Sequence, residues 1–148
     1  MEKSIYEKGI KFQCQGSANC CVSRGSYGFV FLSKKDLSRL AKYFNISLKE
    51  FKTYYCQSSD GFTHLKEIRK KGECIFLKNK KCDVYKARPT QCRTWPFWPE
   101  NMKSKIWNKE IINFCPGIGK GKIISKKKID KLLTIDEINA EEIYREKN

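Results

Sequence analysis

Eight cysteines give this 148-residue chain the side chains most able to do chemistry. A cysteine thiolate binds metal ions or acts as a nucleophile, and two thiols can form a disulfide. Three cysteines stand close together near the N-terminus and the others are spread over the middle of the chain. The positions are Cys14, Cys20, Cys21, Cys56, Cys74, Cys82, Cys92 and Cys115.

The rest of the sequence favours metal binding over disulfides. The N-terminal segment MEKSIYEKGIKF lacks the apolar block of a secretory signal, so we expect a cytoplasmic protein. No apolar run is long enough for a membrane-spanning helix. Disulfides are rare in a reducing cytosol, where clustered cysteines more often bind metal. A disulfide framework is the alternative if the chain is exported.

The number of cysteines limits how they divide among metal sites. Zinc and iron–sulfur centres take about four thiolates each, so one site with spare cysteines or two sites are expected. Cys20 and Cys21 are neighbours whose side chains point to opposite faces of an extended backbone. They therefore serve different sites, or one of them is a core thiol. The later cysteines could together close one tetrathiolate site: Cys74, Cys82, Cys92 and Cys115.

The elements that must position these cysteines indicate a small α+β domain with short strands, several helices and irregular loops. Residues 26–32 are apolar and aromatic and predict a buried strand. Ser33 is a predicted cap for a helix over 34–44 that ends at Asn45. Ser47 and Glu50 form a capping-box pattern for a second helix. We expect a turn at 58–61.

The second half of the chain predicts short strands at 64–68 and 74–77, with a polar turn at 78–81 that leads to Cys82. Three prolines within 88–100 argue against regular helix or a central strand, so a loop packed by its own aromatic side chains is expected. Such a loop could shield a metal cluster near Cys92 from water. Residues 107–114 predict another strand. Residues 125–148 form a helical tail of one domain spanning 1–148.

The cysteine motifs, taken in order, resemble a known family. They are Cys14-x2-Ser17-x2-Cys20-Cys21, Cys74, Cys82, Arg88-Pro-Thr-Gln-Cys92 and Cys115-Pro-Gly, with FVFLSKKDLSRLAKYF between the first two. This series is similar to the YkgJ-like cysteine-cluster proteins, also described as CxxCxxCC zinc- or iron-chelating domains. The resemblance runs over about residues 12–121.

The resemblance implies a metal site built from seven cysteines: Cys14, Cys20, Cys21, Cys74, Cys82, Cys92 and Cys115. The cofactor it implies is an iron–sulfur cluster or zinc. Ser17 replaces the second cysteine of the family's opening motif, and a serine hydroxyl is a poor ligand in a thiolate site. Either a spare cysteine such as Cys56 takes its place, or one cluster uses the other cysteines, or a coordination position stays open.

Three functions follow from these observations. The first is a metal-binding protein whose metal contributes folding energy. The second is a metal-dependent enzyme, because the same domain occurs within the flagellin lysine N-methylases, although those proteins are longer and this chain shows no convincing S-adenosylmethionine site. The third is a basic adaptor that binds nucleic acid.

The charge pattern bears on the third function. Lys and Arg total 31 against 16 Asp and Glu, and the formal net charge is +15. Most of the basic residues are lysines, whereas directed phosphate and base recognition relies on arginine. Nucleic acid is therefore a less favoured partner. A protein partner is compatible with the sequence, which identifies none.

Two further features are weaker candidates. His64 is the only histidine, and the resemblance gives it no metal role. Residues 117–122 carry three glycines and two lysines that could form an anion-binding loop. Pro116 interrupts the junction before that loop and no helix starts directly after it, so a phosphate site is not favoured.

Overall fold

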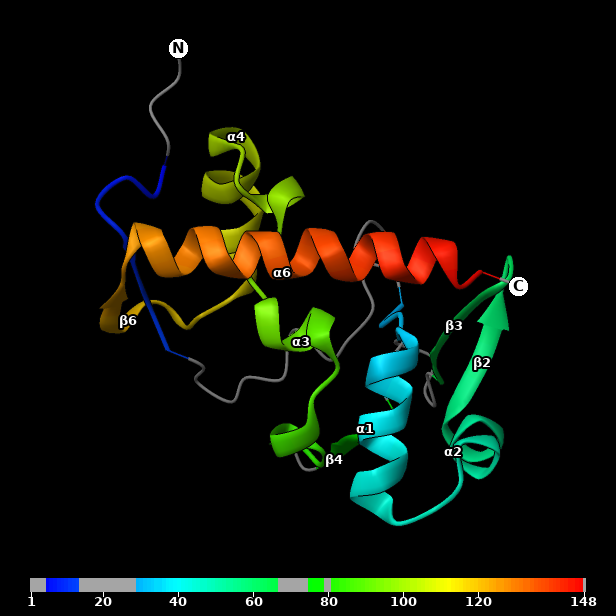
Figure 1. The fold of residues 1–148 in the computed structure, drawn as a ribbon. Helices are drawn as coiled ribbons and strands as arrows, with labels where there is room; N and C mark the ends of the chain where they lie inside the picture. Colours follow the sequence, from blue (N-terminus) through cyan, green and yellow to red (C-terminus); the bar gives the residue numbers. More distant parts are fainter. Residues whose placement is uncertain (1–4, 14–28, 67–74, 79–80, 148) are drawn as a thin grey trace.

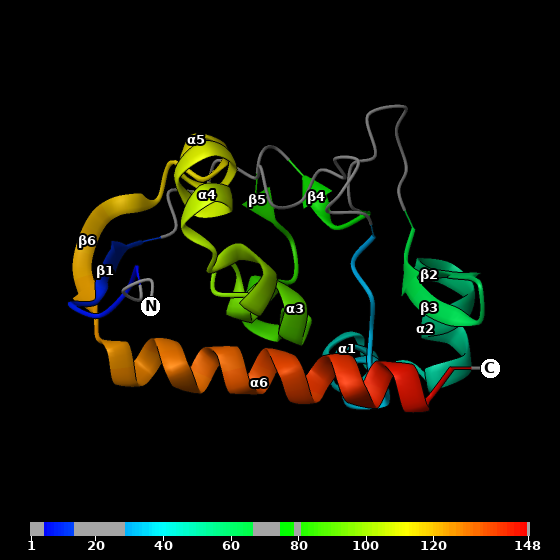
Figure 2. The same ribbon diagram turned by 90° about the horizontal axis from the view of Figure 1, so that it is seen from above.

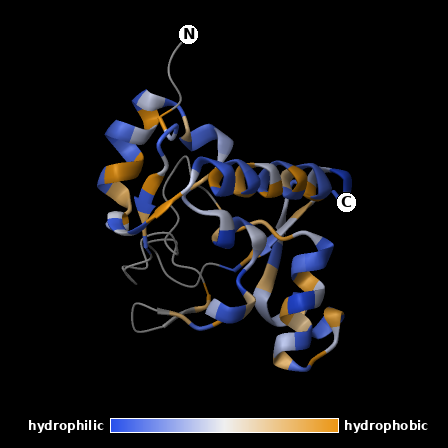
Figure 3. Ribbon diagram, turned by 60° about the vertical axis from the view of Figure 1, so that its left-hand side comes forward, coloured by the Kyte–Doolittle hydropathy of each residue, from blue (hydrophilic) through white to orange (hydrophobic). Residues whose placement is uncertain are grey.

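One long helix, α6 (Lys126–Arg145), runs across the whole molecule, and most other elements lie to one side of it in Figure 2. The computed structural model describes residues 5–13, 29–66, 75–78 and 81–147, and their architecture is the predicted mixture of helices and short antiparallel strands (Figure 1). Hydrophobic and hydrophilic segments alternate along α6 in Figure 3, as expected for a helix with one buried face. None of the described helices is long and apolar enough to span a membrane.

The prediction of two helices in this region is confirmed by α1 (Lys34–Phe44) and α2 (Leu48–Tyr55). Each begins with a capping box: Ser33 with Asp36, and Ser47 with Glu50. Helix α1 ends where Asn45 adopts the left-handed conformation, with φ of 55°. Its N-terminus is tied to the end of α6, because Lys35 pairs with Glu142 at 3.3 Å.

A β-hairpin follows α2 directly. Strands β2 (Cys56–Ser59) and β3 (Phe62–Leu65) pair antiparallel, and the turn lies at Asp60-Gly61, where φ is 52° and 84°. Asp-Gly is the dipeptide that favours a tight hairpin turn with positive φ at both positions. The turn therefore lies within the predicted range 58–61 but is shorter. Strand β3 begins two residues before the strand predicted at 64–68.

Two smaller pairings complete this part of the fold. Within the predicted strand 26–32, the described residues run beside β3: Phe31 bridges His64, and Leu65 donates its amide to the Val30 carbonyl at 3.0 Å. Strands β4 (Leu77–Lys78) and β5 (Lys81–Cys82) form a minimal hairpin across the predicted polar turn.

The proline-rich segment was predicted to contain no helix, and that prediction is wrong. After η3 (Tyr85–Ala87), helix α3 (Thr90–Thr94) spans five residues, and the 3-10 turn η4 is Pro99–Asn101. Pro89 caps α3 and Pro96 lies beyond its end, so neither proline interrupts the helix. A proline before the first turn leaves no helical hydrogen bond unmade.

The strand predicted at 107–114 is also wrong, because this segment is helical. Helix α4 (Ser104–Ile106) continues into a π-helical stretch, η5 (Trp107–Ile111), and then α5 (Ile112–Phe114). Trp107, Ile111 and Phe114 are buried and lie four and three residues apart, which is the spacing of one helix face.

The glycine-rich segment after Cys115 is strand β6 (Ile118–Ile124), which pairs antiparallel with β1 (Ile10–Phe12). Gly117 accepts a hydrogen bond from the Gln13 amide at 3.0 Å, so the backbone of this segment serves the sheet. The β1–β6 ribbon connects to α6, whose start is capped by Ser125.

Buried side chains form two clusters. The first lies among α1, α2, the β2–β3 hairpin and Val84. The second is mostly aromatic and consists of Trp95, Phe97, Trp98, Trp107, Ile111, Phe114, Cys115 and Ile129. The aromatic side chains of 88–100 are therefore packed as predicted, and their partners include Ile129 of α6 and the 104–114 helical segment.

Candidate metal centre

Three of the seven predicted metal ligands lie within the described residues, each on a different element. Cys82 ends β5, Cys92 lies in α3, and Cys115 follows α5. In Figure 1, α3 lies between the α4 segment above and β4 below. The other four predicted ligands, and Ser17, lie outside the described residues: Cys14, Cys20, Cys21 and Cys74.

The structure does not bring the three described cysteines together as one metal-binding group. Within the described ranges, no three His, Cys, Asp or Glu side chains lie close enough to hold one metal ion. A site made from Cys74, Cys82, Cys92 and Cys115 would need three of these thiols in contact with one metal. Because Cys74 lies outside the described residues, that division of the ligands stays a prediction.

A buried aspartate holds the segment that carries Cys92. The Asp36 side chain is 0% exposed, and it accepts hydrogen bonds from the Thr90 amide at 3.0 Å and the Thr90 hydroxyl at 2.7 Å. Arg39 donates to the same carboxylate at 2.7 Å and to the Arg88 carbonyl oxygen at 2.8 Å. A buried charge with this many donors is stable, so Asp36 fixes α3 to α1.

Gln91 adds a second attachment directly before Cys92. Its side chain accepts a hydrogen bond from the Phe31 amide at 3.1 Å and donates one to the Phe29 carbonyl at 3.2 Å. The side-chain amide of Gln91 thus forms the two hydrogen bonds that a neighbouring strand would otherwise make with residues 29–31. Neither Asp36 nor Gln91 was among the predicted site residues. The pattern Ser33-x-x-Asp36 predicts that the aspartate is a capping residue. No sequence pattern near Asp36 predicts its hydrogen bonds to Thr90.

Cys115 is buried in the aromatic cluster, where it is 9% exposed. The Trp95 ring contacts both Trp98 and Phe114 edge-on, with ring centroids 4.7 and 5.6 Å apart. The aromatic side chains of the proline-rich segment therefore belong to the same buried cluster as Cys115. The sequence had associated them with Cys92, which is half-buried.

Cys56 occupies a different environment, the hydrophobic cluster beneath α1 and α2. It is a free thiol, 8% exposed, and faces Leu65 across the β2–β3 hairpin. Burial raises the pKa of this thiol to about 12, although Lys52 and Lys66 oppose the shift. A thiol held in its protonated form is a poor metal ligand. We therefore leave Cys56 out of the ligand set proposed below.

His64 uses both ring nitrogens within the fold. Its Nδ1 lies 2.9 Å from the Leu65 carbonyl oxygen, and its Nε2 lies 2.8 Å from the Ser59 hydroxyl. Since a carbonyl oxygen only accepts, Nδ1 donates the hydrogen bond to Leu65, while Nε2 is occupied by the Ser59 hydroxyl. The ring also stacks on Phe29 at 3.8 Å. These contacts give His64 a structural role.

The arginines beside Cys92 differ in their contacts. Arg88 donates through Nε to the Tyr85 carbonyl at 3.0 Å, and its guanidinium lies 3.9 Å from the centre of the Tyr85 ring. Arg88 therefore supports the turn before α3. Arg93 is exposed to solvent.

The chemistry of the predicted donor set fits zinc and iron. All seven predicted ligands are thiols, and both metals form four-thiolate centres in proteins. Any centre that uses Cys82, Cys92 or Cys115 must be completed by cysteines outside the described residues, because these three do not form a group.

Comparisons with known proteins support a zinc- or iron-chelating domain. The sequence model of the CxxCxxCC family, described as "Putative zinc- or iron-chelating domain", matches residues 13–116. The match begins one residue before Cys14 and ends one residue after Cys115. It therefore covers every predicted ligand and leaves out β6 and α6.

Two relatives come from Methanocaldococcus jannaschii. "Uncharacterized protein MJ0661" is 32% identical over 127 residues, which are 80% of this chain and 65% of the relative. "Uncharacterized protein MJ0939" is 28% identical over 140 residues, 91% of this chain and 46% of the relative. The chain thus spans less than two thirds of the length of either. No solved structure matches significantly.

Proposed function

Because this chain belongs to the family of CxxCxxCC zinc- or iron-chelating domains, we propose that it binds zinc or iron through thiolates drawn from both ends of the family motif. The observation that carries the proposal is the family match over 13–116, which is bounded by the first and last predicted ligands, Cys14 and Cys115. The all-thiol composition of the set supports it.

The proposed ligands are the seven motif cysteines, with the N-terminal ones completing the coordination of the later ones. Cys82, Cys92 and Cys115 come from three elements and form no group of their own. A metal bound by one of them together with Cys14, Cys20, Cys21 or Cys74 would join distant segments of the chain. Such a cross-link contributes directly to folding free energy.

Both candidate centres are compatible with this ligand set. Zinc would act as a structural cross-link, whereas an iron–sulfur cluster would supply one-electron transfer when bound. The aromatic surroundings of Cys115 favour the cluster, since exclusion of water is one way in which proteins tune cluster potential. The metal-binding assignment itself does not depend on this choice.

The test is metal analysis of the full chain, purified anaerobically without a metal-affinity tag. The wild type is compared with Cys92→Ser, Cys115→Ser and, as a matched control, Cys56→Ala. We expect the control to keep the wild-type metal content and the two motif variants to lose metal. Urea unfolding of the same samples should show the motif variants destabilised by more than the control.

The metal and the spectrum distinguish the two centres. Brown protein absorbing near 400 nm with about four irons and equal sulfide indicates a cluster, and colourless protein with one or two zincs indicates structural sites. Wild-type protein without bound metal would refute the proposal, as would equal metal loss in Cys56→Ala and Cys115→Ser.

A further inference from the structure

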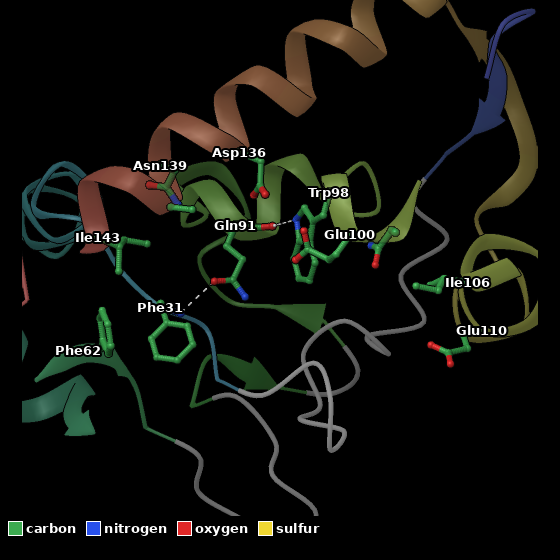
Figure 4. A pocket seen from close by; sticks show the side chains of 12 residues that line it. Phe31, Phe62, Gln91, Trp98, Glu100, Ile106, Glu110, Asp136, Asn139 and Ile143 are labelled. Atoms are coloured by element: carbon green, nitrogen blue, oxygen red, sulfur yellow. Dashed lines mark hydrogen bonds between the residues drawn. The ribbon is translucent and has the colours of Figure 1, made fainter. Parts of the chain in front are cut away.

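A cavity of about 540 Å³ lies between α6 and the segment that follows α3 (Figure 4). Its size is in the range of small-molecule sites. One end, with Phe31, Phe62 and Ile143, is apolar, and Glu110 lies at the other end. Trp98, Glu100 and Asp136 lie between these ends. The remaining lining residues are Gln91, Asn101, Ile106, Asn139 and Ala140.

The charge of the lining is opposite to that of the chain. Lys and Arg make up 31 of the 148 residues, yet none of those that the structure describes lines this cavity. Three of the 16 acidic residues do: Glu100, Glu110 and Asp136. In a protein of net charge +15, this concentration of carboxylates creates a local negative potential that selects cations.

Asn139 provides an independent sign that a ligand is expected here. The residue is 6% exposed and its side chain lines the cavity. Among the described residues, its amide has no hydrogen-bond partner. Its polar atoms are not enclosed by protein, since Arg39 Nε is the only buried side-chain atom without a partner in the part of the chain that the structure describes, so the Asn139 amide is open to the cavity. A ligand with hydrogen-bond donors in the cavity would satisfy the Asn139 oxygen.

Burying the Asp136 carboxylate costs folding free energy, and a bound cation would offset that cost. Burial raises the pKa of this carboxyl group to about 6, Thr94 opposes the shift by donating a hydrogen bond, and Glu100 and Glu137 add to it by repulsion. The Thr94 hydroxyl lies 3.0 Å from Asp136 Oδ1. At neutral pH the group is therefore a carboxylate without a cationic partner among the described residues that line the cavity.

The arrangement of the carboxylates argues against a metal ion as the occupant. They do not form a three-ligand group close enough for one ion, in the part of the chain that the structure describes. Figure 4 shows them spread along the cavity, with Ile106 beside Glu110 and aromatic side chains toward the other end. Charges separated by apolar surface match a ligand whose ammonium groups are separated by methylene chains.

We propose that this cavity binds an aliphatic polyamine, with its ammonium groups on Asp136, Glu100 and Glu110 and its methylene chain against the aromatic and aliphatic walls. One aromatic side chain of the cavity wall already contacts an ammonium group, since Lys147 Nζ lies 5.0 Å from the centre of the Phe62 ring. The described residues that line the cavity include none of the proposed metal ligands, so each site can be tested by its own substitutions.

The test is isothermal titration of spermidine into the full chain purified with its native metal. The carboxylate variants are Glu100→Gln, Glu110→Gln and Asp136→Asn, and Glu141→Gln is the control. Glu141 lies on the same helix outside this cavity, so its loss changes the net charge equally. We expect about fivefold weaker binding for each cavity variant and less than twofold for the control. Glu100 and Glu110 are exposed enough to be replaced without harming the fold.

Three comparison ligands sharpen the outcome: Mg²⁺, the uncharged 1,8-octanediol, and N-acetyl-lysine methylamide, which carries one ammonium. Each should bind more weakly than spermidine. The proposal is overturned if spermidine shows no binding at about 1 mM, binds the cavity variants as well as the wild type, or is matched by any of the three. Metal content, measured on the same samples, should be equal in all variants. A failure of the metal proposal is therefore seen separately.

Discussion

Replacing Asp136 with asparagine should stabilise this protein, and the gain should depend on pH. Asparagine has nearly the shape of aspartic acid and can still accept the hydrogen bond from Thr94. The only large change is the loss of the negative charge. Because burial disfavours that charge, the variant measures what the buried Asp136 charge costs the fold at neutral pH.

The magnitude follows from the shift in pKa, from an ordinary 3.8 to about 6. One pKa unit corresponds to about 1.4 kcal/mol, which gives at most about 3 kcal/mol for the full shift. The carboxylate is partly exposed, so solvent screening reduces this to about 1–2 kcal/mol. The folded state binds the proton more tightly than the unfolded state. The stabilising effect of the proton is therefore complete below about pH 4 and is lost as the pH rises through about 6.

The assay is urea unfolding of wild type and Asp136→Asn at several values from about pH 4 to about pH 8. Near pH 4 the two proteins should have similar free energies of unfolding, and above about pH 7 the variant should be more stable by about 1–2 kcal/mol. Glu141→Gln reports the general effect of removing one negative charge. A stability difference that stays constant with pH, or a variant that is less stable at neutral pH, would refute the reasoning. Spermidine should reduce the difference at neutral pH, because it binds only the wild-type cavity well.

Two other predictions concern the segments around the cysteines. Thr90→Val removes a donor from the buried Asp36 and should cost about 1–2 kcal/mol in urea unfolding, whereas Thr53→Val, which removes an exposed hydroxyl, should cost less than about 0.5 kcal/mol. If both variants lose the same free energy of unfolding, the hydrogen bond between Thr90 and Asp36 does not stabilise the fold more than an exposed one. Gly117→Ala would place a Cβ 2.3 Å from the Gln13 carbonyl oxygen and should cost more than about 2 kcal/mol. Gly119→Ala meets no atom within 4 Å but keeps a φ of 88°, so its cost in thermal unfolding should be only about 1 kcal/mol. A reversed order would contradict this account.

The parts of the fold that the sequence predicted are those with local signals. Helix α1 was predicted to the residue because Ser33 and Asn45 mark its two ends. The Asp60-Gly61 turn likewise carries its own backbone preference. The segment at 107–114 was misassigned because its short apolar run suits a strand as well as a helix. Only the packing of Trp107, Ile111 and Phe114 against the aromatic cluster decides between them.

The candidate sites divide in the same way. The prediction of a zinc- or iron-binding domain came from the types and order of the cysteines, and the family match supports that domain type. Their grouping did not, because contact between Cys82, Cys92 and Cys115 depends on the positions of whole elements. The acidic cavity has no sequence signal at all. Glu100, Glu110 and Asp136 belong to three separate elements, and only tertiary packing brings them to one cavity.

Helix α3 connects the two proposed sites. It is five residues long, too short to be stable alone, so its position is set by what its side chains contact. Thr90 binds Asp36 of α1, and Thr94 binds Asp136 of α6 at the cavity. Gln91 lines the same cavity and directly precedes Cys92. Because one short helix carries the proposed metal ligand Cys92 as well as Gln91 and Thr94, a ligand in the cavity and a metal on Cys92 would order the same residues. Each should therefore reduce the entropy lost when the other binds, and this coupling must be equal in both directions.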